Sequence, residues 1–315
     1  MSVQLDPEAR GLLEIMQAAG APPIHTLSVE EARQRMRTAF MTRGVPLELA
    51  DVRDVVIPLP RGGLTVRVYR PTEGELPLVL FLHGGGWTIN DLDTHDELCR
   101  RLARRSGCLI AAVDYRRAPE YRHPAALEDA YMAYRWLLDN AGELGIDASV
   151  RMVMGESAGA TSVAALTLLS RDLGAPMPTY QLIAYPVMDA PGRWPSYAQR
   201  GSGYTLDREQ IEWFESHYLP HGHDYSDPYL FPLHAADLSA LAPALVVTAE
   251  FDPLRDEGVA YARKLEAAGV PVEHMHAEDQ MHGFLLLGKA VSRAGELIDR
   301  LAGALASHAR QARAS

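Results

Sequence analysis

Short runs of apolar residues alternate with helical patterns along most of this chain of 315 residues. Runs of this kind, bounded by turn residues, are typical of strands that are buried on both faces of a sheet. Such strands are predicted at residues 77–82, 108–113, 150–154, 180–185, 244–248 and 272–276. Residues 55–59 and 64–70, on either side of Arg61-Gly62-Gly63, are predicted to form an opening β-hairpin, which gives eight strands in all. Helices are predicted at residues 96–105, 125–138, 157–173, 254–268 and 290–305. After the opening hairpin, the alternation predicts an α/β fold in which a mostly parallel eight-stranded sheet has helices on both faces.

The first fifty residues depart from this alternation because they contain only helical patterns. Apolar residues at 12–16 indicate a short amphipathic helix. Ser28 and Glu31 form a capping-box pattern, which predicts that a second helix begins there. Two such helices cannot bury a core by themselves, so we expect them to pack on the rest of the chain.

A second segment without strand patterns interrupts the α/β alternation at about residues 189–237. It contains a predicted helix at 207–218 that carries several aromatic residues. We therefore predict an N-terminal helical cap segment at residues 1–50 and an α/β domain at residues 51–315, with a cap insertion at about 189–237.

Composition and charge exclude several other classes of protein. The net charge of −11 is a poor match for a phosphate backbone, so no nucleic-acid partner is expected. No run approaches the roughly 18 apolar residues that a membrane span needs, and residues 1–10 lack the apolar stretch of a signal peptide. We expect a cytoplasmic protein with no membrane partner. Cys99 and Cys108 are too few for a disulfide framework and are expected to be buried free thiols.

The run Gly155-Glu156-Ser157-Ala158-Gly159 lies between a predicted strand and a predicted helix. This is the context of a nucleophile elbow, in which a sharp turn holds the serine in a strained backbone conformation. Small residues flank the serine because larger side chains would collide with neighbouring backbone. The pattern predicts Ser157 as a nucleophile.

A glycine-rich loop, His83-Gly84-Gly85-Gly86-Trp87, follows the strand predicted at 77–82. Consecutive glycines leave backbone N–H groups unobstructed, which suits an oxyanion hole completed by the N–H of Ala158. The alternatives are an ordinary turn or a phosphate loop. A phosphate loop would have a Lys-Ser/Thr pair or a longer glycine spacing, and the chain has neither here.

Two further residues follow predicted strands and complete a catalytic set. Asp252 comes after the strand at 244–248, and His282 comes after the strand at 272–276. A serine hydroxyl is a weak nucleophile until a base accepts its proton. His282 is the expected base, and Asp252 is expected to fix the imidazole tautomer and to stabilise the imidazolium.

Together these motifs resemble the hormone-sensitive-lipase-like esterases of bacterial family IV, in the α/β-hydrolase superfamily. The order Ser157, Asp252, His282 is that of an α/β-hydrolase. The resemblance also rests on the run from Val113 to Glu120, and it covers nearly the whole chain. It implies an α/β-hydrolase fold with a helical cap, and it makes residues 51–315 the catalytic domain.

The same resemblance implies a serine carboxylesterase that hydrolyses short- to medium-chain acyl esters through an acyl-enzyme, with a small-molecule ester as its partner and a homodimer as its assembly. It implies no cofactor and no metal. It assigns the oxyanion hole to Gly85, Gly86 and Ala158, with Gly84 as an alternative donor. Two residues depart from the family pattern, namely Glu156, where Asp or Thr is usual, and Ala160, where a third glycine is common. An ion pair between Glu156 and Arg255 is one hypothesis for the first departure.

Several features have two interpretations. Trp87, Trp213 and Phe214 are candidates for a substrate pocket, but core packing explains such aromatic residues equally well. The pairs His221/His223 and His274/His276 have spacings that a metal could use, although polar surface is the better interpretation because no third ligand follows a recognisable spacing.

Two other functions remain open from the residues alone. One is a binding protein on the hydrolase scaffold, which the presence of His282 disfavours. The other is a serine hydrolase of lactones, carbamates or amides, because the catalytic set does not by itself distinguish these from esters.

Overall fold

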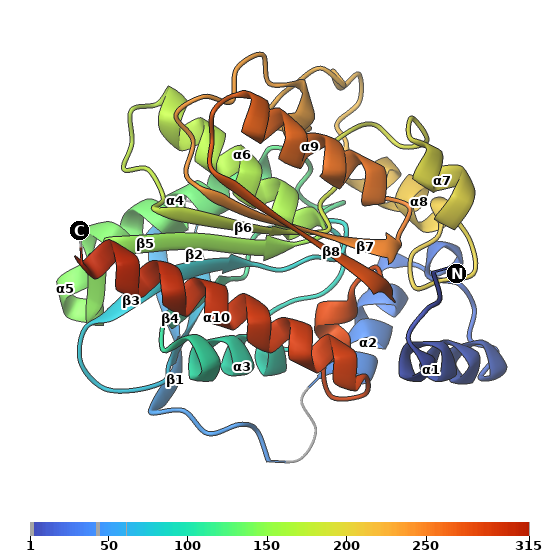
Figure 1. Cartoon of the computed structure of the whole chain (residues 1–315), viewed down its shortest axis with the longest axis horizontal. Coiled ribbons are helices and arrows are strands. Elements are labelled where there is room, and N and C mark those ends of the chain that lie inside the picture. Colours follow the sequence, from blue (N-terminus) through green and yellow to red (C-terminus); the bar gives the residue numbers. More distant parts are fainter. Residues whose placement is uncertain (1–2, 42–44, 61, 315) are drawn as a thin grey trace.

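The computed structural model describes residues 3–41, 45–60 and 62–314. In these residues eight strands form one sheet through the centre of the molecule (Figure 1). The strands are β1 (Asp51–Leu59), β2 (Gly62–Arg70), β3 (Leu76–Leu82), β4 (Leu109–Val113), β5 (Ile146–Glu156), β6 (Tyr180–Ala184), β7 (Ala244–Phe251) and β8 (Val272–Met281). Their order is β1-β2-β4-β3-β5-β6-β7-β8. β2 pairs antiparallel with β1 and β4, and the other neighbours are parallel. The prediction of a mostly parallel eight-stranded sheet is confirmed.

The central strands are apolar on both faces because helices cover both faces. Every residue of β3, β4 and β6 is buried. The covering helices are α3 (Asp96–Ser106), α4 (Ala125–Asp139), α5 (Ala141–Leu144), α6 (Ala158–Asp172), α9 (Arg255–Ala267) and α10 (Ser292–Ala314). α4, α6 and α9 pack on one face, and α3 and α10 pack on the other; Figure 1 shows α6 and α9 above the sheet and α10 and α3 below it. This arrangement confirms the α/β class.

A second group of helices gathers at the carboxyl ends of β5 to β8, on the right of Figure 1. The group consists of α1 (Pro7–Ala18), η1 (Ile24–Thr26), α2 (Val29–Phe40), α7 (Pro195–Arg200) and α8 (Arg208–Tyr218). The predicted capping box of Ser28 and Glu31 is present at the start of α2, and Asp207 with Gln210 forms another at the start of α8. Short helices of one turn, η2 (Pro232–His234) and η3 (Phe284–Leu287), complete the described elements.

The N-terminal helices η1 and α2 pack against helix α8. Ile24 and Ala32 form a cluster with Ile89, and the cluster packs against Trp213 and Phe214 of α8. Ile89 lies just beyond the glycine-rich loop of residues 83–87. Residues that lie more than 150 positions apart in the sequence therefore meet beside this loop.

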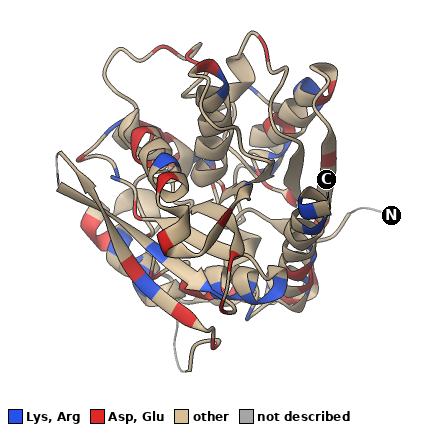
Figure 2. Ribbon diagram, turned by 90° about the vertical axis from the view of Figure 1, so that its left-hand side faces the viewer, with Lys and Arg blue, Asp and Glu red and all other residues tan. Residues whose placement is uncertain are grey.

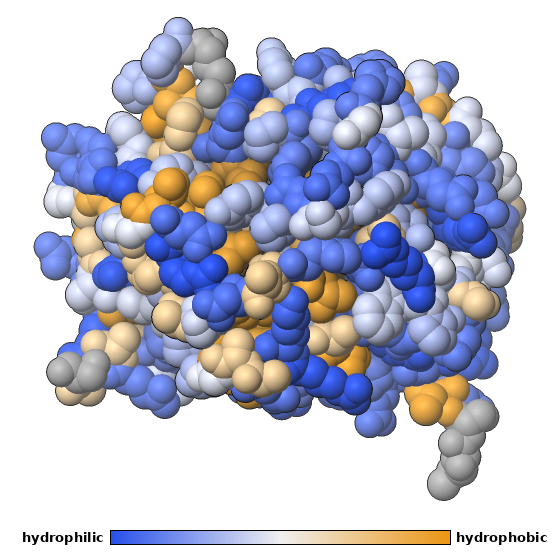
Figure 3. All heavy atoms as spheres, turned by 90° about the horizontal axis from the view of Figure 1, so that it is seen from above, coloured by the Kyte–Doolittle hydropathy of each residue, from blue (hydrophilic) through white to orange (hydrophobic). Residues whose placement is uncertain are grey.

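The surface is polar, with charges of both signs. Acidic and basic residues are interspersed on the side that Figure 2 presents. Among the ion pairs, Arg67 of β2 pairs with Asp54 of β1 and with Asp93. Seen from above, the surface is largely hydrophilic and its apolar residues form separate patches (Figure 3). Cys99 and Cys108 are free and buried, as predicted.

Candidate active site

Ser157 lies at the sharp turn from β5 into α6, as the elbow motif predicts. Its backbone has φ 53° and ψ −127°, a region that costs a side-chain-bearing residue on the order of 1–3 kcal/mol. The turn brings α6 against the end of β3, so that a Cβ on Gly159 would collide with the carbonyl groups of Leu82 and His83. The glycine therefore permits the close approach that holds Ser157 above the sheet.

Asp252 and His282 lie at the ends of the strands that follow, and both side chains reach Ser157 in one chain of hydrogen bonds. His282 Nε2 lies 2.9 Å from Ser157 Oγ, and His282 Nδ1 lies 2.8 Å from Asp252 Oδ2. The Leu254 N–H donates to Asp252 Oδ1 at 2.8 Å, which fixes the carboxylate. All three residues predicted from the sequence are brought together. Asp252 is fully buried, while Ser157 and His282 are each 8% exposed.

The electrostatics of this set suit a base at His282. Burial alone would lower the pKa of His282, but the charge of Asp252 and its hydrogen bond raise that pKa above its ordinary value, with a smaller contribution from Glu156. The ring of Tyr185 packs edge-on against the imidazole, with 4.9 Å between ring centroids.

In the glycine-rich loop, the carbonyl groups of Gly84 and Gly85 accept hydrogen bonds from within the loop region, and the N–H groups of Gly85 and Gly86 do not take part in them. His83 Nδ1 donates to Gly84 O at 2.8 Å, and Gly85 O accepts from Thr88 N and Ile89 N at 3.0 and 2.9 Å. In a planar trans peptide the N–H points opposite to the C=O, so the N–H groups of Gly85 and Gly86 point the other way. Within the described part of the chain, neither of these groups nor the Ala158 N–H has a hydrogen-bond acceptor.

The Gly84 N–H is not free in the same way. It donates to the Glu156 carboxylate, so the structure removes Gly84 from the candidate oxyanion donors. The hypothesis of an ion pair between Glu156 and Arg255 is wrong. Arg255 pairs with Glu250 and Asp256, whereas Glu156 Oε1 lies 3.0 Å from His95 Nε2.

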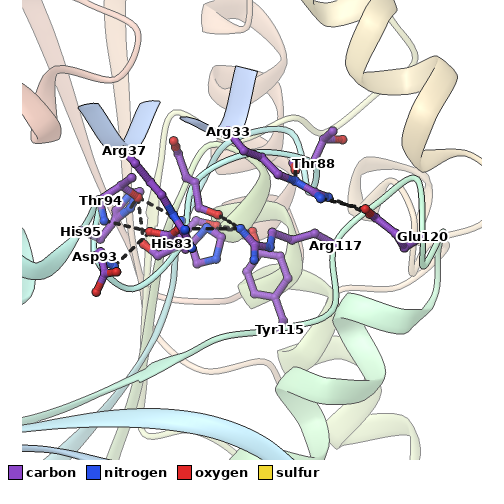
Figure 4. Close-up of polar contacts among 12 residues, drawn as sticks. Arg33, Arg37, His83, Thr88, Asp93, Thr94, His95, Tyr115, Arg117 and Glu120 are labelled. Carbon is purple, nitrogen blue, oxygen red and sulfur yellow. Dashed lines mark hydrogen bonds and ion pairs between the residues drawn. The ribbon is translucent and has the colours of Figure 1, made fainter. Parts of the chain in front are cut away.

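His83 supports the loop from below. Its ring stacks on Tyr115 with 4.2 Å between centroids, and the Tyr115 hydroxyl donates to His83 O at 2.7 Å. Burial, with a smaller contribution from the neighbouring His95, lowers the pKa of His83 to about 3, so the ring is neutral at physiological pH. Figure 4 shows His83, Tyr115 and His95 together beneath the arginines of α2.

The three aromatic residues predicted for the substrate pocket lie in different places. Trp87 is buried, stacks on Tyr218 with 4.1 Å between centroids, and donates to Ser162 Oγ at 3.0 Å, so it lies in the core. Trp213 of α8 packs against the cluster of Ile24, Ala32 and Ile89. Phe214 lies directly over Gly86, where its ring occupies the space that a Cβ would need.

Three of the four histidines considered as metal ligands, His223, His274 and His276, are held by other groups. Thr248 Oγ1 lies 2.9 Å from both His274 Nε2 and His276 Nδ1, and His223 Nδ1 contacts Pro220 O at 3.1 Å. Residues 3–41, 45–60 and 62–314 contain no group of three or more His, Cys, Asp or Glu side chains placed to hold a metal ion.

A family model described as alpha/beta hydrolase fold matches residues 79–286, which include all three residues of the hydrogen-bonded set. The chain belongs to the α/β-hydrolase family. The resemblance to the hormone-sensitive-lipase-like esterases of this family is also confirmed. The relatives described next are ester hydrolases, and the chain matches them over most of their length.

Two curated α/β-hydrolase relatives span nearly all of this chain. The carboxylic ester hydrolase LipN of Mycobacterium tuberculosis is 40% identical over 94% of this chain and 82% of its own length. The ethyl acetate hydrolase of Pseudomonas putida is 38% identical over 97% of this chain and 100% of its own length. Among solved α/β-hydrolase structures, a thermostable esterase from Pseudomonas putida superposes with a TM-score of 0.93 at 34% identity, covering 98% of this chain and 99% of that chain.

Among the described residues, none of the helices combines the length and the apolar character that a transmembrane segment requires.

Proposed function

We propose that the protein is a serine carboxylesterase that hydrolyses short- to medium-chain acyl esters of small molecules. The observation that carries the proposal is the continuous hydrogen-bonded set of Ser157, His282 and Asp252. The named relatives support it, because they include a carboxylic ester hydrolase, an ethyl acetate hydrolase and an arylesterase of Saccharolobus solfataricus.

Acylation begins at the Ser157 hydroxyl. As Oγ attacks the ester carbonyl carbon, His282 Nε2 accepts the hydroxyl proton, and the resulting imidazolium is stabilised by Asp252. The N–H groups of Gly85, Gly86 and Ala158 donate to the oxyanion. The imidazolium then gives its proton to the leaving alkoxide, which departs as an alcohol and leaves the acyl group on Ser157.

Deacylation repeats the same steps with water. His282 Nε2 removes a proton from a water molecule as the water attacks the acyl carbonyl. The oxyanion is held by the same N–H groups, and the proton on His282 returns to Ser157 Oγ as the carboxylic acid leaves.

The proposal includes a cap made of residues 1–50 and of the insertion at about 189–237, on a catalytic domain of residues 51–315. The packing of Trp213 and Phe214 against the cluster of Ile24, Ala32 and Ile89 supports this division. The glycine-rich loop of residues 83–87 is the oxyanion loop of this proposal. Phe214 lies over Gly86 of this loop, and its ring fills space there, which supports a short acyl pocket. A cytoplasmic location and a homodimer belong to the same proposal, and cell fractionation and light scattering would test them.

Hydrolysis of p-nitrophenyl esters from acetyl to palmitoyl, by the wild type and by Ser157→Ala, tests the proposed function. The wild type should cleave the shorter esters, and Ser157→Ala should lose at least about 10⁴-fold in kcat because no nucleophile remains. Ser170→Ala is a matched control. Ser170 lies on the same helix, and its buried hydroxyl has no hydrogen-bond partner among the described residues. A folded wild type that cleaves none of the esters, or an active Ser157→Ala variant, would contradict the proposal.

A further inference from the structure

Glu156 is a buried carboxylate between two parts of the active site. It is the last residue of β5, it directly precedes Ser157, and it is 2% exposed. Burying a carboxylate costs several kcal/mol unless charged or hydrogen-bonding groups compensate it. The compensating groups here are the Gly84 N–H and the His95 ring, and both approach the same oxygen, Glu156 Oε1.

The contact with Gly84 joins the nucleophile elbow to the oxyanion loop. A Cβ on Gly84 would collide with the Glu156 carboxyl group, so the loop comes as near as a glycine allows. The Gly84 N–H fixes the peptide plane that precedes Gly84. The peptide planes that carry the N–H groups of Gly85 and Gly86 are the next two in the chain. Holding the Gly84 N–H therefore orients the start of the segment that carries the proposed oxyanion donors.

His95 holds the other side of the carboxylate. An ionised carboxylate can only accept hydrogen bonds, so His95 Nε2 carries a proton. On the opposite side of the ring, His95 Nδ1 lies 3.0 Å from Thr94 Oγ1. Thr94 is held in turn by Asp91, whose backbone N–H donates to Thr94 Oγ1 at 2.9 Å. Both ring nitrogens are thus engaged, and the buried imidazole is fixed in place.

This network extends to the N-terminal helix α2. Arg37 of α2 pairs with Asp91 at 2.5 Å, and Figure 4 shows Arg37, Thr94 and His95 as one connected group that reaches from the helix into the protein. The Glu156 carboxylate stays ionised in these surroundings. Burial alone would raise the pKa of Glu156, but the hydrogen bond and charge of His95, the charge of His282 and the Gly84 N–H lower it below its ordinary value.

We propose that Glu156 and His95 are positioning residues of the esterase reaction: Glu156 holds the Gly84 N–H and so orients the N–H groups of Gly85 and Gly86 toward the oxyanion, and His95 holds Glu156. The inference rests on the proposed function. It gives the departure from the family's usual Asp or Thr a role in the transition state, because oxyanion donors act through their exact direction toward the developing charge. Removing one such donor costs about 10²–10³ in kcat, so a misdirected pair should cost about 10–100-fold.

The test compares Glu156→Leu, which removes the acceptor at similar size, with Glu156→Gln, which keeps a carbonyl oxygen for the Gly84 N–H. The measurements are kcat and KM for p-nitrophenyl butyrate, and the affinity of a trifluoromethyl ketone, which forms a tetrahedral oxyanion on Ser157. We expect Glu156→Leu to lower kcat by about 10–100-fold with KM changed less than about threefold, and to weaken the ketone in parallel. Glu156→Gln should recover most of the kcat and most of the ketone affinity. The values of His95→Leu should lie between those of Glu156→Leu and Glu156→Gln.

Glu257→Gln is the matched control. Glu257 is also a buried glutamate that accepts backbone N–H groups, from Met188 and Asp189, but it does not contact the oxyanion loop. The Glu257→Gln variant should have the same ratio of ketone affinity to substrate KM as the wild type. If Glu156→Leu does not fold, Glu156→Ala takes its place, since it removes the same acceptor without adding apolar atoms beside His95.

Three results would overturn the inference. They are a folded Glu156→Leu or Glu156→Ala variant with kcat within about twofold of the wild type, a loss of kcat without a matching loss of ketone affinity, and a Glu156→Gln variant no better than Glu156→Leu. Failure of the proposed function would be seen elsewhere, as a wild type that hydrolyses no ester or as an active Ser157→Ala variant.

Discussion

His282 makes two hydrogen bonds that together require one tautomer. The Asp252 carboxylate can only accept, so His282 Nδ1 carries the proton, and the lone pair of Nε2 faces the Ser157 hydroxyl. This is the tautomer that a general base needs before it takes the proton of the nucleophile. Asp252 Oδ1 also accepts the Leu254 N–H, so both carboxylate oxygens are hydrogen-bonded and the carboxylate is fixed in orientation.

The pH dependence of kcat/KM should report His282. Its pKa lies above the ordinary 6.5, because the charge and hydrogen bond of Asp252 outweigh burial and Glu156 contributes further negative charge. The base is active when neutral, so kcat/KM should fall as the pH decreases through a midpoint above 6.5. In Glu156→Gln the imidazolium loses a neighbouring negative charge, so the midpoint should move to lower pH.

Hydrolysis of p-nitrophenyl butyrate from pH 5 to 9, with Ser157→Ala as the blank, measures this midpoint. The groups that face the His282 imidazole are Ser157, Asp252 and the ring of Tyr185, with Glu156 acting through its charge. A wild-type midpoint at or below 6.5 would contradict the assignment of the fall in kcat/KM at low pH to protonation of His282 beside Asp252. An unchanged midpoint in Glu156→Gln would show that the Glu156 charge does not reach the imidazole.

At the scale of single residues, the sequence predicted the triad but not the partners of Glu156. Each triad residue follows a strand at one edge of a parallel sheet, and that local context is visible in the sequence. The contact between Glu156 and His95 joins residues 61 positions apart, and its geometry depends on how the loop before α3 folds over β5. Arg255 was the wrong partner because Glu250 and Asp256, close to it in the chain, already pair with it.

At the scale of elements, Arg33 attaches helix α2 to two loops that follow strands β3 and β4. Its Nε donates to Thr88 O at 2.9 Å, its Nη2 donates to Ala118 O at 2.8 Å, and its two Nη groups pair with Glu120 at 2.7 Å each (Figure 4). Thr88 lies two residues beyond Gly86, so this one side chain joins the N-terminal helix to the oxyanion loop.

Arg33→Met should therefore destabilise the protein by about 1–3 kcal/mol, because two carbonyl groups lose a charged donor while the aliphatic part of the side chain remains. Arg208→Met is the control, since Arg208 on α8 makes an exposed pair with Glu212 that should contribute about 0.5 kcal/mol or less. Urea unfolding measures both changes, and limited proteolysis should cut Arg33→Met first in the N-terminal helices. Equal stabilities of the two variants would refute the attachment.

Most helices and strands of the α/β core were predicted, although β8 and α10 continue beyond the predicted ends at residues 276 and 305 and α5 was not predicted. The helices of residues 1–50 and 189–237 were predicted less well. The helix predicted at residues 157–173 is α6 (Ala158–Asp172), and the one predicted at 207–218 is α8 (Arg208–Tyr218). By contrast, the sequence indicated residues 12–16 where α1 (Pro7–Ala18) forms, and it gave no signal for α7 (Pro195–Arg200). Helices α1 and α7 are short and partly exposed, so their apolar periodicity is weak and packing on the rest of the chain decides their ends.

At the scale of the whole molecule, the strand order follows from contacts that no single segment encodes. β4 lies between β2 and β3, so consecutive strands along the chain are not always neighbours in the sheet. A right-handed crossover from β3 through α3 to β4 is compatible with several positions of β4. The apolar runs predicted buried strands in the middle of the sheet, but they do not encode which strands are neighbours.

The two buried thiols should report the stability of this whole sheet and its helices. Cys99 on α3 and Cys108 before β4 are both fully buried in the cluster that packs α3 and α10 on the sheet. The thiolate is the reactive form. Burial raises the pKa of Cys108 to about 11 and that of Cys99 well above its ordinary value, so neither thiol should react in the folded protein.

We therefore expect Ellman's reagent to label both thiols slowly and at one shared rate that rises with urea as steeply as global unfolding does. The variants Cys99→Ala and Cys108→Ala assign the rate to each thiol, and the remaining thiol should react as in the wild type after correction for stability. Rapid labelling of one thiol in native buffer would instead show that α3 opens separately from the sheet. In that case the His95 end of α3, and with it the support of Glu156, would move on the timescale of that opening.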